Sequence, residues 1–523
     1  MGKTGDGFDA ATFAQRFNHL GREYGRRFKE IYSHMRAHCP VTHTDELGGF
    51  WVVTRYADIM RAACDHEAFA SRYGVRLSVK PAIPRARFGP LGEERTGPLA
   101  LAYPPGPNGE APRLGLLPLE LDPPLHGLYR EAIDPLFSPH AVSELAPWLL
   151  TLTDQLIDAI IEKGEGDFSR DLSTPLASIC TMRILGLPLG DWSDYAWFIQ
   201  SANGGSSSVQ PRTRNPSERE LRERVAAEVV RQRSQLMANG AIAHLIGATV
   251  DGRKLDSWEI EATIWVIIGT LDATQAGMGS GFVWLSRNPE QRRRLAETPR
   301  LMPHALEEFL RVFSPAHARS RTVMRDVELA GQTLKPGDRA LLPWVSGNLD
   351  ETEFANPEEV DFDRANKRHM AFGLGPHRCI GADIVRLEFL GVFGRILNRM
   401  PDFRVDEAAA AVAGASQRSR LRACAFCFYA REKVRRSPHR LVTQAGFFAR
   451  PAWAATAGLR SSVFSRSDQA RMSARDHKVV LSSKSMDQSS RSNHETHRQE
   501  SSHHRRKQWH RAGHRPSLRC RRR

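Results

Sequence analysis

The residues best suited to chemistry in this chain form a ten-residue loop around one cysteine. The loop reads Phe372-Gly373-Leu374-Gly375-Pro376-His377-Arg378-Cys379-Ile380-Gly381. Its glycines and proline predict a tight turn, and a helical pattern begins directly after the cysteine. A thiolate at a helix start is stabilised by unpaired N–H groups and by the positive end of the helix dipole. The loop therefore predicts a sulfur anion bound to a metal, with a flat macrocycle lying against the glycines.

The elements that must position this loop are mostly helical, because apolar residues recur at helical spacing through most of the chain. The predicted helices cover residues 192–202, 216–236, 256–287, 303–312 and 380–400. A short β-rich run at residues 50–54 predicts a strand, and Gly, Pro and Ser predict loops at 98–118 and 203–215. The expected fold class is mainly α with small β-sheets (α+β).

Composition divides the chain into two regions. Of 523 residues, the last 113 (411–523) contain 26 of the 74 Lys and Arg residues and 6 of the 59 Asp and Glu residues. Residues 1–410 therefore carry 48 basic and 53 acidic residues, so the net charge of +15 comes from the tail. We expect residues 1–410 to be the catalytic domain, without specific binding of nucleic acid.

The same composition bears on the compartment. We find no run of about 18 consecutive apolar residues, so we expect no membrane span. The N-terminal residues lack the pattern of a secretory signal. Seven scattered cysteines argue against a disulfide framework and favour a reducing, cytoplasmic environment.

A buried free cysteine would account for Cys379 alone, but not for Phe-Gly-x-Gly-x-His-x-Cys-x-Gly, which the loop matches throughout. In this motif, and from about residue 50 to 403, the chain resembles the cytochrome P450 family of haem-thiolate monooxygenases. The resemblance implies haem b (iron protoporphyrin IX) between a long central helix and the cysteine loop. It makes Cys379 the axial iron ligand, whose electron donation favours O–O cleavage. The cofactor contacts that it implies in the loop are Phe372, Gly373, His377 and Gly381.

Glu308 and Arg311 place a carboxylate and a guanidinium three residues apart on one helix face. Alone, such a pair is a common surface feature worth roughly a few tenths of a kcal/mol. Here it is similar to the family's Glu-x-x-Arg motif, and the resemblance implies that Arg364 completes an ion network. We expect this network to hold the haem-binding core rather than to do chemistry.

Cations must meet the two haem propionates. His126 and Arg130 lie four residues apart, on one face of a helix predicted after two prolines, and match the family's His-x-x-x-Arg element. Arg321 and His369 occupy positions that contact propionates in relatives. We expect a haem contact from each of these four residues; the alternative for each is a solvated charge or a core histidine.

The helix at 256–287 contains Ile267-Ile268-Gly269-Thr270-Leu271-Asp272-Ala273-Thr274. An acid in an apolar run costs desolvation unless it has partners or water, and a Gly-Thr pair can loosen a helix. Together they favour a kink with trapped water facing a cofactor; the alternative is an acid on the wet side. The family's segment is Ala/Gly-Gly-x-Asp/Glu-Thr, whose acid and alcohol relay protons. Asp272 aligns with the acid, Ala273 holds the threonine position, and Thr274 follows one step later.

That step turns the side chain about 100° around the helix. Asp272, Ala273 and Thr274 are therefore the candidate catalytic positions, although the Thr274 hydroxyl need not replace the missing one. Substrate hydroxyls or water could supply the proton, or electrons could couple poorly to product. The enzyme could also use peroxide or perform a rearrangement in place of ordinary hydroxylation.

The resemblance implies a monooxygenase that inserts one oxygen atom of O2 into a hydrophobic small molecule. Substrate contacts would come from the loops at 98–118 and 203–215 and from the central helix. Bacterial members generally receive electrons from a ferredoxin and its reductase, supplied by NAD(P)H. Arg378 and neighbouring basic residues would form a docking surface for that acidic partner.

The tail, residues 411–523, is rich in Arg, Ser and His in no periodic order. Such composition predicts disorder, and our interpretation is a non-native, frame-shifted extension. Relatives close with a β-hairpin after the position of Phe403, for which we find no convincing pattern here. Besides the monooxygenase and the peroxide-using or rearranging enzyme, a third hypothesis is therefore a haem-binding protein with little turnover.

Overall fold

The computed structural model describes most of the chain up to residue 427. The described residues are 8–77, 116–202, 207–213, 215–235, 240–366 and 368–406, with the backbone of 411–413, 420–423 and 425–427. All of them lie in the first of two units of the chain, Met1–Leu441. Nearly all of the loop predicted at 98–118, part of that at 203–215 and most of the basic tail lie outside the described residues.

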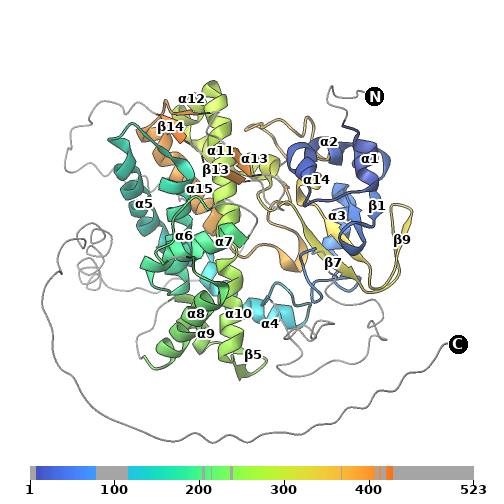
Figure 1. Ribbon diagram of the computed structural model, residues 1–523, viewed down its shortest axis with the longest axis horizontal. Helices are drawn as coiled ribbons and strands as arrows, with labels where there is room; N and C mark the ends of the chain where they lie inside the picture. Colours follow the sequence, from blue (N-terminus) through green and yellow to red (C-terminus); the bar gives the residue numbers. More distant parts are fainter. Residues whose placement is uncertain are drawn as a thin grey trace, which may run out of the picture. The chain divides into compact units, whose positions relative to one another are not determined.

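The described part of the first unit is mainly helical with small sheets, as the sequence predicted. Helices α10 and α11 run end to end through its middle, and α11 contacts α6, α7 and α13 (Figure 1). The helices are α1 (Ala10–Gln15), α2 (Arg22–His38), α3 (Tyr56–Cys64), α4 (Leu125–Ile133), α5 (Pro139–Ile161), α6 (Thr174–Leu185), α7 (Trp192–Ala202), α8 (Glu218–Arg233), α9 (Gly240–Gly247), α10 (Ser257–Ile268), α11 (Leu271–Arg287), α12 (Pro289–Glu297), α13 (Met302–Phe313), α14 (Trp344–Asn348) and α15 (Ala382–Arg399).

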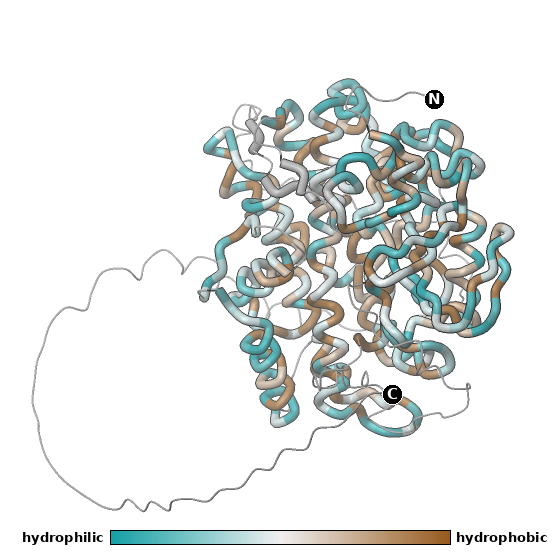
Figure 2. Tube along the Cα trace, turned by 45° about the vertical axis from the view of Figure 1, so that its right-hand side comes forward, coloured by the Kyte–Doolittle hydropathy of each residue, from teal (hydrophilic) through white to brown (hydrophobic). Residues whose placement is uncertain are grey.

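The predicted helices agree closely with the observed ones. Helix α7 has the predicted bounds, and α8, α13 and α15 differ from prediction by a few residues at most. Amphipathic helices carry apolar residues on one face, and in Figure 2 brown and teal alternate along many of the helical turns. Within the described ranges, every helix is too short or too polar to cross a bilayer.

The single helix predicted at 256–287 is two helices, α10 and α11, joined at Gly269 and Thr270. The N–H groups of Thr270 and Ala273 donate to carbonyls three residues earlier, at 3.0 and 3.1 Å. This tighter pattern interrupts the α-helical ladder at the Gly-Thr pair, in agreement with the predicted loosening of the helix there; the trapped water stays a prediction.

A five-stranded sheet lies on the other side of the central helices from α5 and α6 (Figure 1). Its strand order is β1 (Val41–Thr44), β2 (Phe50–Val53), β10 (Arg339–Leu342), β7 (Arg319–Val323) and β3 (Phe69–Ala70). Strand β2 confirms the strand predicted at 50–54, and it runs parallel to β10 while the other neighbours are antiparallel. A short hairpin, β8 (Val327–Leu329) with β9 (Gln332–Leu334), follows β7.

The closing hairpin that the sequence failed to reveal is present. Strands β12 (Ala411–Ala413) and β13 (Arg420–Ala423) pair antiparallel. Strand β14 (Ala425–Cys427) then joins β11 (Arg404–Val405) and β4 (Glu165–Asp167) in a second sheet. Strands β12, β13 and β14 lie beyond residue 410, the predicted domain boundary. Alternation of apolar and polar residues over only three or four positions does not stand out in a sequence. Whether these residues form strands is therefore determined by pairing with distant strands.

A stack of aromatic rings connects this second sheet to the central helix. The Phe282 ring of α11 stacks between Phe168 and Phe403, with centroid distances of 4.2 and 4.1 Å. All three side chains are buried. The stack fixes the chain after α15 against α11 and so places Phe403 and the strand that follows it next to the helix that carries Asp272.

Candidate active site

The cysteine loop is a tight turn that ends at the first residues of α15. Gly373 and Gly375 have φ angles of +69° and +66°, in the left-handed region that favours glycine. At Gly375 a Cβ atom would lie 2.6 Å from the Ala63 carbonyl oxygen, so only glycine fits. The Cys379 N–H donates to the Phe372 carbonyl at 2.8 Å and closes the loop. The cysteine is thereby held just before α15, as predicted.

Cys379 is half-buried, and its sulfur lies among groups that favour an anion. Burial raises the pKa of the thiol, whereas the Gly381 N–H and the guanidinium groups of Arg130 and Arg378 lower it. A thiolate that bonds to a metal cation satisfies both influences, because the metal takes up the negative charge that burial penalises.

Two histidines and an arginine converge beside this loop. The His126 ring of α4 lies 4.2 Å from the His377 ring, measured between centroids. Burial lowers the pKa of His126 to about 4 and, with Arg321 and His126 nearby, that of His377 to about 2. Burial also lowers the pKa of Arg321 to about 10, opposed by the carboxylate of Asp122. An anionic ligand would pair with the buried Arg321 guanidinium and accept hydrogen bonds from the neighbouring imidazole rings.

His377 supplies the observation that identifies such a ligand. Both of its ring nitrogens are buried and have no hydrogen-bond partner among the described residues. An unsatisfied buried polar group costs about 1–3 kcal/mol, so each such atom calls for a partner. The predicted haem carries propionate groups that would accept a hydrogen bond here, and the residues of the cluster therefore fit that cofactor.

Arg130 connects the cluster to the cysteine loop. Its guanidinium donates to the Arg378 carbonyl at 2.8 Å and pairs with Asp134 at 3.0 Å. Because Arg130 and His126 lie one turn apart on α4, this contact places both side chains against the loop. The sequence prediction that these two residues act together is consistent with this arrangement.

Two further residues of the motif lie where a flat ring could approach. A Cβ atom at Gly381 would meet no protein atom within 4 Å. The Phe372 ring is half-buried, and the Arg386 guanidinium lies 4.8 Å from its centroid. The arrangement leaves the backbone at Gly381 open to close approach, as the glycine predicted.

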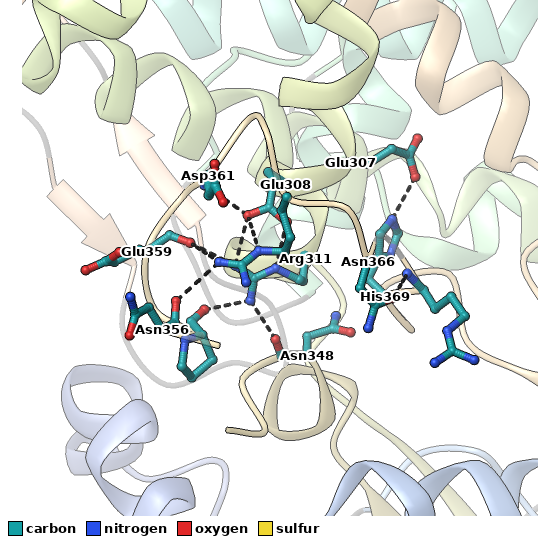
Figure 3. Close-up of polar contacts among 12 residues, drawn as sticks. Glu307, Glu308, Arg311, Asn348, Asn356, Glu359, Asp361, Asn366 and His369 are labelled. Carbon is teal, nitrogen blue, oxygen red and sulfur yellow. Dashed lines mark hydrogen bonds and ion pairs between the residues drawn. The ribbon is translucent and has the colours of Figure 1, made fainter. Parts of the chain in front are cut away.

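His369 already has partners in the protein. Its Nδ1 accepts the Ala371 N–H at 3.2 Å, and its Nε2 donates to the Glu307 carboxylate at 2.8 Å (Figure 3). These bonds tie the chain before Phe372 to α13. The expected contact of His369 with a propionate stays a prediction.

Glu307 is a residue that the sequence analysis missed. Burial alone would raise its pKa, but hydrogen bonds from His369 and Arg386 lower it to about 2. Arg386 of α15 donates to both carboxylate oxygens, at 2.7 and 3.0 Å. The partners are 62 and 79 residues from Glu307, so no local pattern signals them.

The predicted ion network is formed by buried side chains. Arg311 and Glu308 make two contacts at 2.9 and 3.0 Å, and Arg364 reaches the same carboxylate at 3.1 Å (Figure 3). Arg311 also donates to the carbonyls of Asn348, Pro357 and Glu359 at 2.6–2.9 Å. Removing one partner of such a buried pair costs about 3–5 kcal/mol, because the other charge stays buried. The geometry indicates a structural role for the network.

On the central helix, the three candidate catalytic positions do not share one face. Asp272 and Thr274 are buried, with 2% and 9% of their surface exposed, whereas Ala273 is half-buried. Thr274 therefore does not take the orientation of Ala273, as the turn of about 100° per residue requires. Thr270, which the sequence analysis treated only as part of the Gly-Thr pair and not as a catalytic candidate, is exposed.

Comparisons with known proteins extend these observations. The family model described as Cytochrome P450 matches residues 217–407. A steroid C26-monooxygenase of Mycobacterium tuberculosis (strain CDC 1551 / Oshkosh) is 30% identical over 311 residues, covering 57% of this chain and 82% of the relative. Cytochrome P450 CYP107DY1 of Priestia megaterium is 31% identical over 289 residues, covering 55% and 70%.

Solved structures agree on the fold. Cytochrome P450 CYP109Q5 from Chondromyces apiculatus superposes with a TM-score of 0.66 at 23% identity, covering 80% of this chain and 99% of that one. CYP108D1 from Novosphingobium aromaticivorans has a TM-score of 0.65 at 22% identity and covers 79% and 99%. Similarity that spans most of each relative, on a fold shared with solved members, places this chain in the cytochrome P450 family of haem monooxygenases.

Proposed function

We propose that the protein is a haem b thiolate monooxygenase that inserts one oxygen atom of O2 into a hydrophobic small organic molecule. Electrons would come from NAD(P)H through a ferredoxin reductase and a ferredoxin. The observation that carries the proposal is the convergence of His126, Arg321 and His377 beside the Cys379 loop. Both ring nitrogens of His377 lack a partner among the described side chains. Such a cluster suits the two carboxylates of a protoporphyrin whose iron bonds to the adjacent sulfur.

The residues of the site would then have separate tasks. Cys379 would bond to the iron, and the Gly381 N–H would stabilise the sulfur charge. His126, Arg130, Arg321 and His377 would hold the propionates. When bound, the haem supplies the oxygen activation. The Glu308 network and the His369–Glu307 pair would keep the loop rigid without taking part in chemistry.

An apolar substrate is supported by side chains of the central helices, which the family resemblance places beside the haem. Around the break between α10 and α11, the side chains that are not buried include Val266, Ile267 and Ala273. These groups offer apolar contact and no charge. Relatives include proteins named as a steroid C26-monooxygenase and a cyclomarin C epoxidase, and we extend an organic substrate to this chain.

A redox partner would dock on the cysteine side. Arg378 is exposed one residue before the proposed iron ligand, and Arg130 lies against its carbonyl. Exposed guanidinium groups attract an acidic protein and increase its association rate, an effect that salt weakens. A ferredoxin is acidic and carries one electron at a time, so it suits this surface.

The first experiment is the absorption spectrum of the reduced, CO-bound protein after haem supplementation. The proposal predicts the red-shifted band of thiolate-ligated haem in the wild type and its loss in Cys379→Ser. Cys64→Ser, which changes an exposed cysteine of α3, is the matched control and should keep the band. A colourless wild type, or an unchanged spectrum in Cys379→Ser, would refute the proposal. Extraction of the haem into acidified butanone identifies it as non-covalent haem b.

The propionate contacts have a test of their own. Replacing His377 with Ala removes a buried partner worth about 1.5–3 kcal/mol in a charged hydrogen bond. Haem transfer to apomyoglobin should then be about 10- to 100-fold faster than from the wild type. His140→Ala, at an exposed histidine of α5, should leave the transfer rate unchanged. Equal rates in all three proteins would contradict the proposed contact.

A second candidate function is a peroxide-using or rearranging enzyme, and Ala273 is the observation that favours it. The family's proton-relaying threonine is absent at this position. Turnover with ferredoxin, reductase and NAD(P)H should be compared with turnover by hydrogen peroxide alone. Faster product formation with peroxide would favour the second candidate over the first.

A further inference from the structure

One face of the central helices is only partly covered by the rest of the protein. Between Ile260 and Ser280, nearly all side chains are buried. The exceptions beyond Glu261 are Val266, Ile267, Gly269, Thr270, Ala273 and Ser280. Positions 266, 270 and 273 follow the 3.6-residue period of a helix, so they lie on one face.

Thr270 supplies a hydroxyl to this face. It is exposed, whereas its neighbours Ile268, Leu271 and Asp272 are buried. Thr263 and Thr274, the other threonines of the two helices, are buried with 1% and 9% exposure. Among the described threonines of α10, α11 and the join between them, Thr270 is therefore the one that a ligand over the Ala273 face can reach.

The helix break fixes the orientation of this hydroxyl. The Thr270 Oγ1 donates to the Ile267 carbonyl at 2.6 Å, and the Thr270 N–H donates to the same oxygen at 3.0 Å. A hydroxyl that donates one hydrogen bond keeps two lone pairs as acceptors. Thr270 Oγ1 is thus anchored by the backbone and still able to accept a hydrogen bond from a ligand.

We propose that Thr270 is a catalytic residue whose hydroxyl replaces the one that Ala273 lacks. This inference rests on the proposed function. Thr270 Oγ1 would keep its hydrogen bond to the Ile267 carbonyl and accept hydrogen bonds from the ligand on this face and from a water molecule, which delivers the proton to that ligand. The proton is drawn from solvent, the hydroxyl is unchanged after each cycle, and no oxidant or reductant is consumed in this step. A Gly-Thr pair at the break thereby has a chemical as well as a conformational role.

The test compares Thr270→Val with Thr270→Ser and with Thr263→Val. Thr263 is the matched control because its Oγ1 also donates to a backbone carbonyl, that of Glu259 at 2.8 Å, but is buried in protein. The first readout, the C–O stretching frequency of the reduced CO complex in the infrared, does not depend on turnover. The second is the ratio of peroxide released to NAD(P)H consumed.

Thr270→Val should shift the C–O stretch and raise the peroxide ratio severalfold, with coupled turnover at least about tenfold lower. Thr270→Ser should restore both, and Thr263→Val should match the wild type. Identical spectra and ratios in Thr270→Val and the wild type would overturn the inference, as would the same shift from Thr274→Val alone. A wild type without a thiolate-type CO spectrum would instead refute the proposed function itself, so the two failures are distinguishable.

Discussion

Glu388 shows what burial does to a single residue outside the reaction. It lies on α15, is 3% exposed, and accepts a hydrogen bond from the Cys180 thiol of α6. Burial raises the pKa of Glu388 from its ordinary 4.5 to about 7, and the thiol only partly offsets this. A carboxyl group of this kind is neutral in the acid range and becomes a buried charge in the alkaline range.

The stability of the protein should therefore depend on pH through Glu388. Because its pKa is raised on folding, the stabilisation is complete below about pH 4.5 and is lost as the pH rises through about 7. Glu388→Gln keeps the hydrogen bond and removes the charge. At pH 9 the free energy of unfolding of the variant should exceed that of the wild type by on the order of 3 kcal/mol. Urea unfolding at pH 5 and pH 9 measures this.

The control for that experiment is Glu131→Gln, at an exposed carboxylate of α4. The free energy of unfolding of this variant should change with pH in the same way as that of the wild type. A constant difference between Glu388→Gln and the wild type from pH 5 to pH 9 would contradict the assignment of the titrating group.

Two glycines of the cysteine loop make different demands. Gly375 needs both a positive φ and the absence of a side chain, because a Cβ atom would meet the Ala63 carbonyl at 2.6 Å. Gly381 has a φ of −85°, which any residue adopts, and open space around its Cα. The first glycine is required by the protein fold, and the second by whatever lies against the loop.

Alanine at these positions should separate folding from haem binding. Gly375→Ala should destabilise the protein even without haem, by about 1–3 kcal/mol from backbone strain. Gly381→Ala should leave the stability of the haem-free protein within about 0.5 kcal/mol of the wild type and yet weaken haem binding. Thermal unfolding of the haem-free protein and haem titration measure the two effects. Normal haem affinity in Gly381→Ala would place the macrocycle elsewhere.

At the scale of elements, helix α4 is fastened to the start of α10. The Tyr129 hydroxyl donates to the Glu259 carboxylate, which Arg253 of β6 (Arg253–Lys254) also contacts at 2.7 Å. Burial would raise the pKa of Glu259, but these hydrogen bonds hold it below its usual range. The same α4 carries His126 and Arg130, so this attachment positions the residues that we assign to the propionates.

Tyr129→Phe tests the attachment. Loss of a hydrogen bond to a buried carboxylate should lower the free energy of unfolding by about 1.5–3 kcal/mol. Haem transfer to apomyoglobin should also accelerate, since α4 is held less firmly. The comparison is Tyr195→Phe, whose hydroxyl donates to a carbonyl at 3.4 Å and should matter less. Equal unfolding free energies for both variants would show that the attachment contributes little.

At the scale of the whole molecule, the second sheet joins distant parts of the first unit. Strand β14 lies between β11, which follows α15, and β4, which follows α5 (Pro139–Ile161). Phe168 follows β4 directly in the chain and Phe403 directly precedes β11. Both rings stack on Phe282 of α11. The catalytic unit therefore includes residues beyond 410, and the described strands continue to Cys427.

Two truncations test where this unit ends. A chain ending at Leu441 should bind haem with the thiolate-type spectrum of the full chain. A chain ending at Ala410 lacks β12, β13 and β14, leaves the edge of β4 unpaired, and should aggregate or melt several degrees lower. Expression, thermal unfolding and the CO spectrum of both chains provide the comparison. Equal behaviour of the two would restore the boundary predicted from composition.

The sequence alone was sufficient for features that depend on neighbouring residues. The glycine pattern around Cys379 predicted the turn, because φ preferences are local. The Gly269-Thr270 pair predicted the break in the central helix, and apolar periodicity predicted helices such as α7. The ion network of Glu308 and Arg311 was found through a motif, since its first pair lies within one helical turn.

Tertiary structure decided whatever depends on partners far along the chain. His369 forms a hydrogen bond with Glu307, 62 residues away, and His377 lies beside His126 of α4. Periodicity gave the angle between Thr270 and Thr274, but not which of them faces away from the packed side of the helices. Packing against other elements determines that orientation, and no pattern of neighbouring residues encodes the elements that will arrive there.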